Sequence, residues 1–258
     1  MSNKAINTEQ GHWILAKMGK RVLRPGGKEL TLKLINNLKI EHTDDIVEFA
    51  PGLGYTASVT LQKQPKTYTG IELNEEVAGI LRKTIKGNDR KIIVGNASDS
   101  TLKEDAADKV YGEAMLTMHA DHRKSEIIRE AHRILKKGGL YGIHELGLYP
   151  NDLNEEIKGD IQKQLAQTIK VNARPLTQSE WTTLLENEGF KIVKVETNAM
   201  ALLEPKRMID DEGFFRTLKI VFNILTHSNA RKRIVAMRNT FRKYDKYLNA
   251  VAIVAEKK

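Results

Sequence analysis

The chain has 258 residues, of which 40% are hydrophobic, so it can bury one sizeable core with an appended subdomain. It contains no cysteine, which excludes disulfides, thiolate metal sites and cysteine nucleophiles, and we predict no metal site. Residues 1–10 lack the apolar core of a signal peptide, and no uncharged run approaches the length of a membrane span, so we expect a cytoplasmic protein. The formal net charge of +9 is concentrated near the C-terminus, as shown below.

Apolar periodicity predicts helices that alternate with strands over the first 145 residues. The helices are expected near residues 8–19, 27–38, 55–63, 74–86 and 122–137, and the strands near 46–50, 67–72, 91–95, 108–115 and 140–145. Two helices (152–170 and 177–188), a strand (190–198), two further helices and a final strand (248–255) follow. This alternation predicts a parallel sheet with helices on both faces and ligands at the carboxyl ends of its strands.

The first predicted strand runs directly into a glycine turn. Ile46 and Val47 lie in the strand, and Gly52-x-Gly54 follows it. Glycine lets a ligand approach the backbone, and the next helix offers free N–H groups at its N-terminus. Eighteen residues beyond Gly54, Glu72 ends the second strand, where a carboxylate can accept hydrogen bonds from both hydroxyls of a ribose. Together these features predict a cofactor that contains a nucleoside.

Two classes of cofactor share this geometry. The pattern Gly52-x-Gly54-x-x-Ala57 satisfies the glycine fingerprint of nicotinamide and flavin binding. Glu48 favours a ligand with an ammonium group instead, because a carboxylate is poorly placed beside a pyrophosphate. The run Glu48-x-Ala50-x-Gly52-x-Gly54 resembles the acid-x-Gly-x-Gly-x-Gly motif of the class I S-adenosylmethionine-dependent methyltransferases, with alanine in place of the first glycine.

Later segments extend this resemblance over about residues 40–146. Residues 91–97 resemble the third strand and adenine-binding segment of that family, and residues 107–116 resemble its fourth strand. Residues 129–140 and 141–145 resemble the helix, Gly-Gly turn and fifth strand of the branch that includes ubiquinone and menaquinone biosynthesis methyltransferases. The resemblance implies an α/β fold, a Rossmann-like doubly wound sheet of seven strands whose last strand is antiparallel, and S-adenosyl-L-methionine as the cofactor.

The cofactor-binding residues expected from these motifs lie in the glycine loop and after the second, third and fourth strands. They are Glu48, Ala50, Gly52, Gly54, Glu72, Leu73, Asn96, Ala97, Thr117 and Met118. Asn96 can accept a hydrogen bond from an adenine amino group through its side-chain oxygen, or it can be a turn residue. Arg24, before the Pro-Gly-Gly run, is a candidate for the methionine carboxylate or a surface arginine.

Two residues are candidates for catalysis. Methyl transfer from a sulfonium depends mainly on alignment, and a base is needed only when the nucleophile arrives protonated. His119, after the fourth strand, is the obvious base candidate beside the cleft, with a structural role as the alternative. His144 and Glu145 end the fifth strand, where alternation turns only one of them into the cleft, and we favour Glu145.

The segment between Pro205 and Lys246 has eleven Lys and Arg residues and four acids, a net charge of +7. Two apolar helical faces run through it, and we expect both to pack against the carboxyl edge of the sheet as a roof over the substrate cleft. The residues expected to reach inward are Phe214, Phe222, Met237 and Phe241, while Arg231, Lys232, Arg233 and Arg242 should stay outside or meet an acidic group. The alternatives are a solvated basic surface, or a lid or docking surface for an anionic or lipid-like partner, including peripheral membrane contact.

These expectations divide the chain into four parts and favour one reaction. The parts are an N-terminal helical cap (1–40), a cofactor-binding core (41–204), a basic helical insertion or lid (205–246) and the final strand of the core (247–258). The chain lacks the Asn-Pro-Pro-Tyr type of motif after the fourth strand, and nucleic acid is therefore disfavoured as a partner. We predict methyl transfer to a small, apolar or anionic acceptor, with a nicotinamide- or flavin-dependent oxidoreductase and a non-catalytic binding protein as the alternatives.

Overall fold

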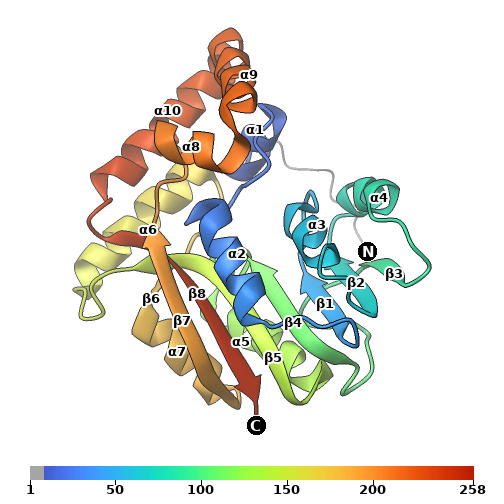
Figure 1. Cartoon of the computed structure of the whole chain (residues 1–258). Helices are drawn as coiled ribbons and strands as arrows, with labels where there is room; N and C mark the ends of the chain where they lie inside the picture. Colours follow the sequence, from blue (N-terminus) through green and yellow to red (C-terminus); the bar gives the residue numbers. More distant parts are fainter. Residues whose placement is uncertain (1–8) are drawn as a thin grey trace.

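The computed structural model describes residues 9–258, which contain one mixed sheet with helices on both faces (Figure 1). The strands are β1 (Asp45–Phe49), β2 (Thr67–Glu72), β3 (Arg90–Val94), β4 (Ala107–Glu113), β5 (Leu135–Leu148), β6 (Leu176–Thr177), β7 (Phe190–Ala199) and β8 (Leu248–Lys257). Seven of them follow the order β3-β2-β1-β4-β5-β8-β7, and the two-residue β6 pairs with β5 off this path.

The direction of the strands confirms the predicted Rossmann-like sheet. The pairs β1–β2, β1–β4, β2–β3 and β4–β5 are parallel. Only β8 reverses direction, and it lies antiparallel between β5 and β7. The carboxyl ends of β1, β2, β4 and β5 therefore share one edge of the sheet, where ligands of such folds bind.

The helices match the expected order, with one addition in the basic segment. They are α1 (Gly11–Lys17), α2 (Gly27–Asn37), α3 (Tyr55–Leu61), α4 (Glu75–Thr84), α5 (Asp121–Ile134), α6 (Glu155–Ile169), α7 (Gln178–Asn187), α8 (Pro205–Glu212), α9 (Phe214–Thr226) and α10 (Ser228–Lys243), with a short 3₁₀ turn at Leu116–Met118. Three helices, rather than the two expected, join β7 to β8, because Gly213 adopts a φ of +80° between α8 and α9.

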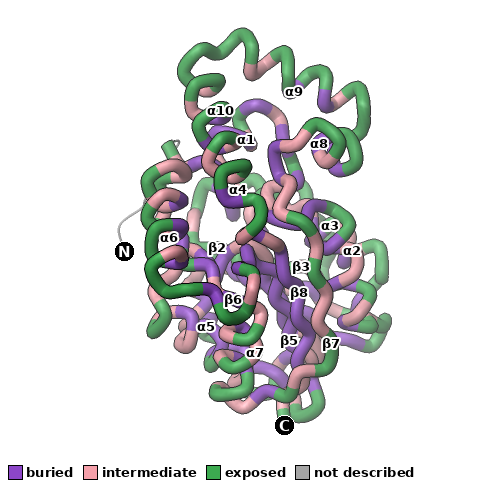
Figure 2. Tube along the Cα trace, turned by 90° about the vertical axis from the view of Figure 1, so that its left-hand side faces the viewer, coloured by how far each residue is buried: buried purple, intermediate pink, exposed green. Residues whose placement is uncertain are grey.

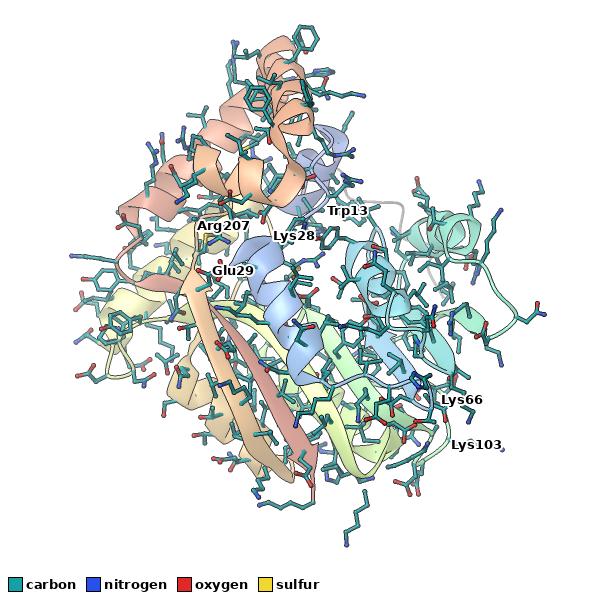
Figure 3. All side chains as sticks on the ribbon, viewed as in Figure 1. Trp13, Lys28, Glu29, Lys66, Lys103 and Arg207 are labelled. Carbon is teal, nitrogen blue, oxygen red and sulfur yellow. The ribbon has the colours of Figure 1, made fainter. Side chains whose placement is uncertain are left out.

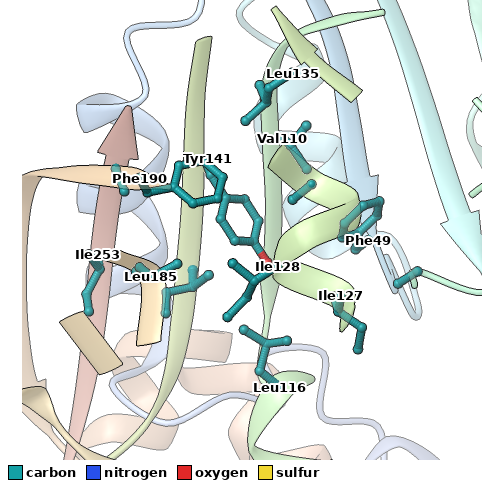
Figure 4. Packing of buried hydrophobic residues seen from close by; sticks show 14 of the residues in the cluster. Phe49, Val110, Leu116, Ile127, Ile128, Leu135, Tyr141, Leu185, Phe190 and Ile253 are labelled. Carbon is teal, nitrogen blue, oxygen red and sulfur yellow. The ribbon is translucent and has the colours of Figure 1, made fainter. Parts of the chain in front are cut away.

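Two apolar clusters cover the two faces of the sheet. On one face, Tyr141 and Phe190 pack at a ring-centroid distance of 5.4 Å among aliphatic residues of α5 and α7 (Figure 4). On the other face, Leu34 of α2 packs with Tyr68 and Tyr111, which are fully buried. Burial on both faces accounts for the continuous apolar strands that the sequence contains.

A third layer lies over the carboxyl edge of the sheet and consists of α1, α8, α9 and α10. Two sets of polar contacts fix α8 to α2 and to the segment that joins α1 to α2. The buried Lys20 Nζ lies 3.4 Å from Asp211 Oδ2 of α8. Arg207 of α8 donates to the carbonyl oxygen of Gly26 at 3.0 Å and lies 3.7 Å from Glu29 of α2 (Figure 3).

The two apolar faces of the basic segment do not share one environment. On α10, Ile234 and Met237 are buried and Phe241 is half-buried, as expected. On α9, Phe214 and Phe222 are exposed, so the expectation that they reach inward is wrong. The reason is that α9 packs on the rest of the layer through a different side, on which Thr217 and Ile220 are buried.

Candidate active site

The glycine loop leaves room for a ligand at one position only. Gly52 and Gly54 have φ values of +56° and +79°. A Cβ added to Gly52 would meet nothing nearer than the Ala50 carbonyl oxygen at 4.0 Å, whereas one added to Gly54 would lie 2.8 Å from Leu81 Cδ2. Gly54 is therefore required by packing, while Gly52 presents open backbone beside the start of α3.

Glu72 is joined to this loop. Its Oε2 accepts a hydrogen bond from Gly52 N at 3.2 Å, and its Oε1 accepts one from Asn74 N at 3.0 Å. Burial raises the pKa of the Glu72 carboxyl, and the backbone N–H groups beside it oppose that shift. The neighbouring Leu73 is 70% exposed. An acid and an exposed apolar side chain thus flank the open backbone, and this arrangement fits the ribose and base of a nucleoside.

Glu48 lies deeper than its predicted role requires. Its Oε2 accepts hydrogen bonds from the hydroxyls of Tyr68 at 2.6 Å and Tyr111 at 2.7 Å. Burial raises the pKa of Glu48 to about 7, although the two tyrosine hydroxyls favour the ionised form. These contacts hold β1, β2 and β4 together, and an interaction of Glu48 with an ammonium group stays a prediction.

Asn96 adopts the turn geometry that the sequence left open. Its Oδ1 accepts hydrogen bonds from Ser98 N at 3.1 Å and Ser98 Oγ at 3.2 Å, and Ala97 beside it is buried. The oxygen expected to meet an adenine amino group therefore already has two donors. Contact of Asn96 and Ala97 with a cofactor stays a prediction.

Glu145 holds the segment that follows β4. This fully buried carboxylate accepts hydrogen bonds from Met115 N at 3.0 Å, Leu116 N at 2.8 Å, Thr117 N at 3.0 Å and Thr117 Oγ1 at 2.7 Å. Burial raises the pKa of Glu145, and these donors oppose the shift. Four donors on two oxygens favour a positioning role over the predicted role as a base.

His119 ends the same segment and is half-buried. Its backbone N–H donates to the Leu116 carbonyl oxygen at 3.0 Å. Burial lowers the pKa of its imidazole, and the positive charges of Arg123 and Lys124 lower it further. The ring is therefore neutral at pH 7, which a base requires, but it does not line the cavity described below.

A buried ionic network beside the glycine loop was missed by the sequence analysis. Glu113, at the end of β4, accepts hydrogen bonds from Arg24 Nη1 at 2.7 Å and Thr31 Oγ1 at 2.8 Å, and lies 2.7 Å from His144 Nδ1. Burial alone would raise the pKa of Glu113, but Arg24 and His144 lower it to about 2. Arg24 also donates to Thr56 of α3, so it is a network residue rather than a surface arginine.

An apolar cavity of about 90 Å³ lies next to the segment held by Glu145. Thr117 and Met118 of that segment line it, together with Met237 and Phe241 of α10. His12 of α1 is the one titratable side chain among the described residues that line it. Burial lowers the pKa of His12 to about 4, so it is a neutral hydrogen-bonding group at pH 7.

Comparison with known proteins places this site in context. A family model described as a methyltransferase domain matches residues 47–143, which contain the glycine loop, Glu72 and the segment after β4. An uncharacterized protein of Haemophilus influenzae is 35% identical over 254 residues, which cover 96% of this chain and 98% of that protein.

Two solved structures share the fold at low sequence identity. The first is a phosphoethanolamine N-methyltransferase of Haemonchus contortus in complex with phosphomonomethylethanolamine and S-adenosylhomocysteine, with a TM-score of 0.74 and 16% identity over 98% of this chain and 59% of that one. The second is a geranyl diphosphate methyltransferase in complex with S-adenosylmethionine, with a TM-score of 0.65 and 15% identity over 89% of this chain and 85% of that one.

Proposed function

Because the chain belongs to the class I S-adenosylmethionine-dependent methyltransferases, we propose that it methylates a small acceptor of largely apolar character. The family uses S-adenosylmethionine as its cofactor, so the cofactor is not a nicotinamide or a flavin, the alternative that the glycine fingerprint left open. The observation that carries the proposal is the apolar cavity, which opens beside the segment after β4, where the sheet presents its ligands.

The cofactor is held, in this proposal, by the glycine loop and the ends of β2 and β3. Gly52 offers open backbone, Glu72 offers its carboxylate to the ribose hydroxyls, and the exposed Leu73 covers one face of the base. When it is bound, the cofactor supplies a methyl group activated by a sulfonium. The chain's own residues then have to bind the two reactants and exclude water from between them.

The acceptor occupies the cavity between the core and α10. Its apolar part contacts Met118, Met237 and Phe241, which together offer a flexible apolar wall. The neutral imidazole of His12 is the group that orients the acceptor's polar atom. We assign Glu145 to the positioning of Thr117, and a base role for His119 stays a prediction.

Different parts of the chain bind the cofactor and cover the acceptor in this proposal. We propose that residues 41–204 and 247–258 form the cofactor-binding core. The cap at residues 1–40, of which residues 1–8 lie outside the described part, and the insertion at residues 205–246 cover the acceptor. Figure 3 shows Trp13 of the cap on the side of α1 that is turned toward α3, where it would cover the cleft.

Labelling of a metabolite extract tests the proposal. The purified protein is incubated with the extract and methyl-labelled S-adenosylmethionine, and label is expected in an extractable small molecule. S-adenosylhomocysteine should raise the melting temperature by linkage, whereas NAD, NADP and FAD should not. Glu72→Ala should weaken that stabilisation by roughly 1–3 kcal/mol, because it removes the acceptor of the ribose hydrogen bonds.

Two variants that fill the cavity make the assay specific. Met237→Trp and Ala173→Phe, from different walls, should abolish label transfer while they leave the response to S-adenosylhomocysteine intact. Val235→Trp is the matched control, because Val235 lies on the exposed side of the same helix. Label in protein or nucleic acid, or full activity in both cavity variants, would contradict the proposal.

A further inference from the structure

Helix α9 presents a large apolar surface to solvent. Phe215 is 84% exposed and Phe222 is 65% exposed. The six exposed apolar residues of α9 are Phe214, Phe215, Leu218, Val221, Phe222 and Leu225. At 100° per residue they cover about one third of the circumference of the helix, so they form one continuous stripe. We call this stripe the α9 face, and Figure 2 shows α9 exposed at the end of the molecule opposite the C-terminus.

The α9 face is not needed to hold the helix in place. A different side of α9 already packs on the molecule, where Thr217 and Ile220 are buried. Asn223 Nδ2 also donates to the Met18 carbonyl oxygen at 2.9 Å, and Arg216 donates to the Gly19 carbonyl oxygen at 3.1 Å. The helix is therefore fixed with its apolar stripe turned outward. Exposed apolar stripes of this kind mark interaction surfaces.

The charge around the α9 face identifies the partner. From Phe214 to Lys243, across α9 and α10, the chain contains no Asp or Glu. The basic residues of the same span are Arg216, Lys219, Arg231, Lys232, Arg233, Arg238, Arg242 and Lys243. Arg216, Arg238, Arg242 and Lys243 pair with Glu212, Glu204 and Asp160. Lys219 of α9 and Arg231 and Lys232 of α10 are exposed and form no ion pair among the described residues. A partner must therefore be apolar where it meets the stripe and negatively charged around it.

We infer that the α9 face docks on the surface of an anionic membrane. An interfacial helix places its aromatic and aliphatic side chains at the boundary between headgroups and acyl chains, while Lys and Arg attract anionic lipids. Within residues 9–258, none of the helices has the length and apolar content needed to cross a bilayer, so the contact is peripheral. A second copy fits less well because two such basic surfaces repel each other, and nucleic acid fits less well because the centre of the surface is apolar.

Membrane docking would bring the cavity close to the lipid. The α10 helix follows α9 directly, and Met237 and Phe241 on its inner side line the cavity. An acceptor that partitions into the bilayer would then be near its binding site. The α9 face and the charges around it are sufficient for membrane docking, whatever the acceptor is.

Vesicle sedimentation with the full chain tests the inference. Binding is measured to vesicles of phosphatidylcholine and to vesicles in which about one third of the lipid is phosphatidylglycerol, at low and at physiological salt. We expect binding to the anionic vesicles that weakens as salt rises. Phe215→Ser with Phe222→Ser should lower the partition coefficient about tenfold or more. Lys219→Gln with Lys232→Gln should lower it about fivefold per residue at low salt.

Matched pairs of exposed residues elsewhere provide the controls. Tyr149→Ser with Val193→Ser removes exposed apolar surface, and Lys86→Gln with Lys103→Gln removes exposed charge, both far from α9 in sequence. Neither pair should change vesicle binding, and melting curves show whether each variant is folded. Failure to bind anionic vesicles would overturn the inference. A dimer that the two Phe→Ser changes dissociate would also overturn it, as would nucleic-acid binding that only the lysine changes reduce.

Discussion

Replacing Glu145 by glutamine separates the two roles that this residue can have. The carboxylate uses Oε1 for Met115 N and Leu116 N, and Oε2 for Thr117 N and Thr117 Oγ1. Glutamine keeps one oxygen and turns an NH₂ group toward Thr117. The Thr117 N–H then loses its acceptor, the Thr117 hydroxyl has to turn and accept from the NH₂ group, and the two remaining bonds lose their charged acceptor. Hydrogen bonds to a charged group contribute about 1.5–3 kcal/mol each. Because glutamine also avoids the burial of a charge, we expect a net loss of about 2–4 kcal/mol.

The assay is the melting temperature of the protein without ligands. For a chain of this size the loss corresponds to a decrease of about 4–16 °C. Thr117→Val is the graded control, since it removes one of the four hydrogen bonds and should cost about 1 kcal/mol. If Glu145→Gln melts like the wild type but no longer transfers methyl groups, and its pH profile changes, the positioning argument fails and the base role predicted from the sequence is correct.

Three further predictions concern the glycine loop and the buried acid beneath it. Ala50→Gly should stabilise the protein by about 0.5–1 kcal/mol in urea unfolding, because Ala50 has a φ of 52° and the relief of strain exceeds the added freedom of the unfolded chain. Gly54→Ala should lower the free energy of unfolding by about 2–3 kcal/mol, because the added methyl group would meet Leu81. Gly52→Ala should lower the free energy of unfolding by only about 1 kcal/mol, but it should abolish the rise in melting temperature with S-adenosylhomocysteine. The raised pKa of Glu48, about 7, means that its contribution to stability is complete below about 4.5 and is lost as pH rises through 7. Glu48→Gln should therefore leave the stability at pH 4 unchanged and raise it by up to about 3 kcal/mol at pH 8.5, and an equal effect at both pH values would refute this reasoning.

The elements of the sheet were predictable because each rests on a local apolar run. The main departure is β5, which begins at Leu135 rather than near residue 140. The Gly138-Gly139 pair predicts a break between helix and strand there, but the backbone pairs Ala107 with Leu135 before the register shifts toward Lys109. A shift of pairing register depends on both strands, so the sequence of β5 alone does not predict where this strand begins.

The candidate site was predictable to the extent that it is local. The glycine loop and Glu72 come from neighbouring strands, and the structure joins them through Gly52 N. Glu113 and Arg24 are 89 positions apart, and nothing near either residue indicates the other. The same holds for Glu145, whose donors lie 28 to 30 positions earlier. The roles of buried acids thus depend on partners that only the fold brings together.

The two helices α9 and α10 show the same limit for apolar patterns. Each has an apolar stripe at helical spacing, and from such a stripe we expected burial for both. On α10 the stripe closes the cavity through Met237 and Phe241. On α9 the residues that pack inward, such as Ile220, lie on the side away from the stripe, because an apolar helix of this breadth has more surface than one neighbour can cover. An apolar stripe therefore predicts that a helix face needs a partner. For α9, the exposed Lys219 beside the stripe and the lack of any Asp or Glu between Phe214 and Lys243 indicate that the partner is anionic.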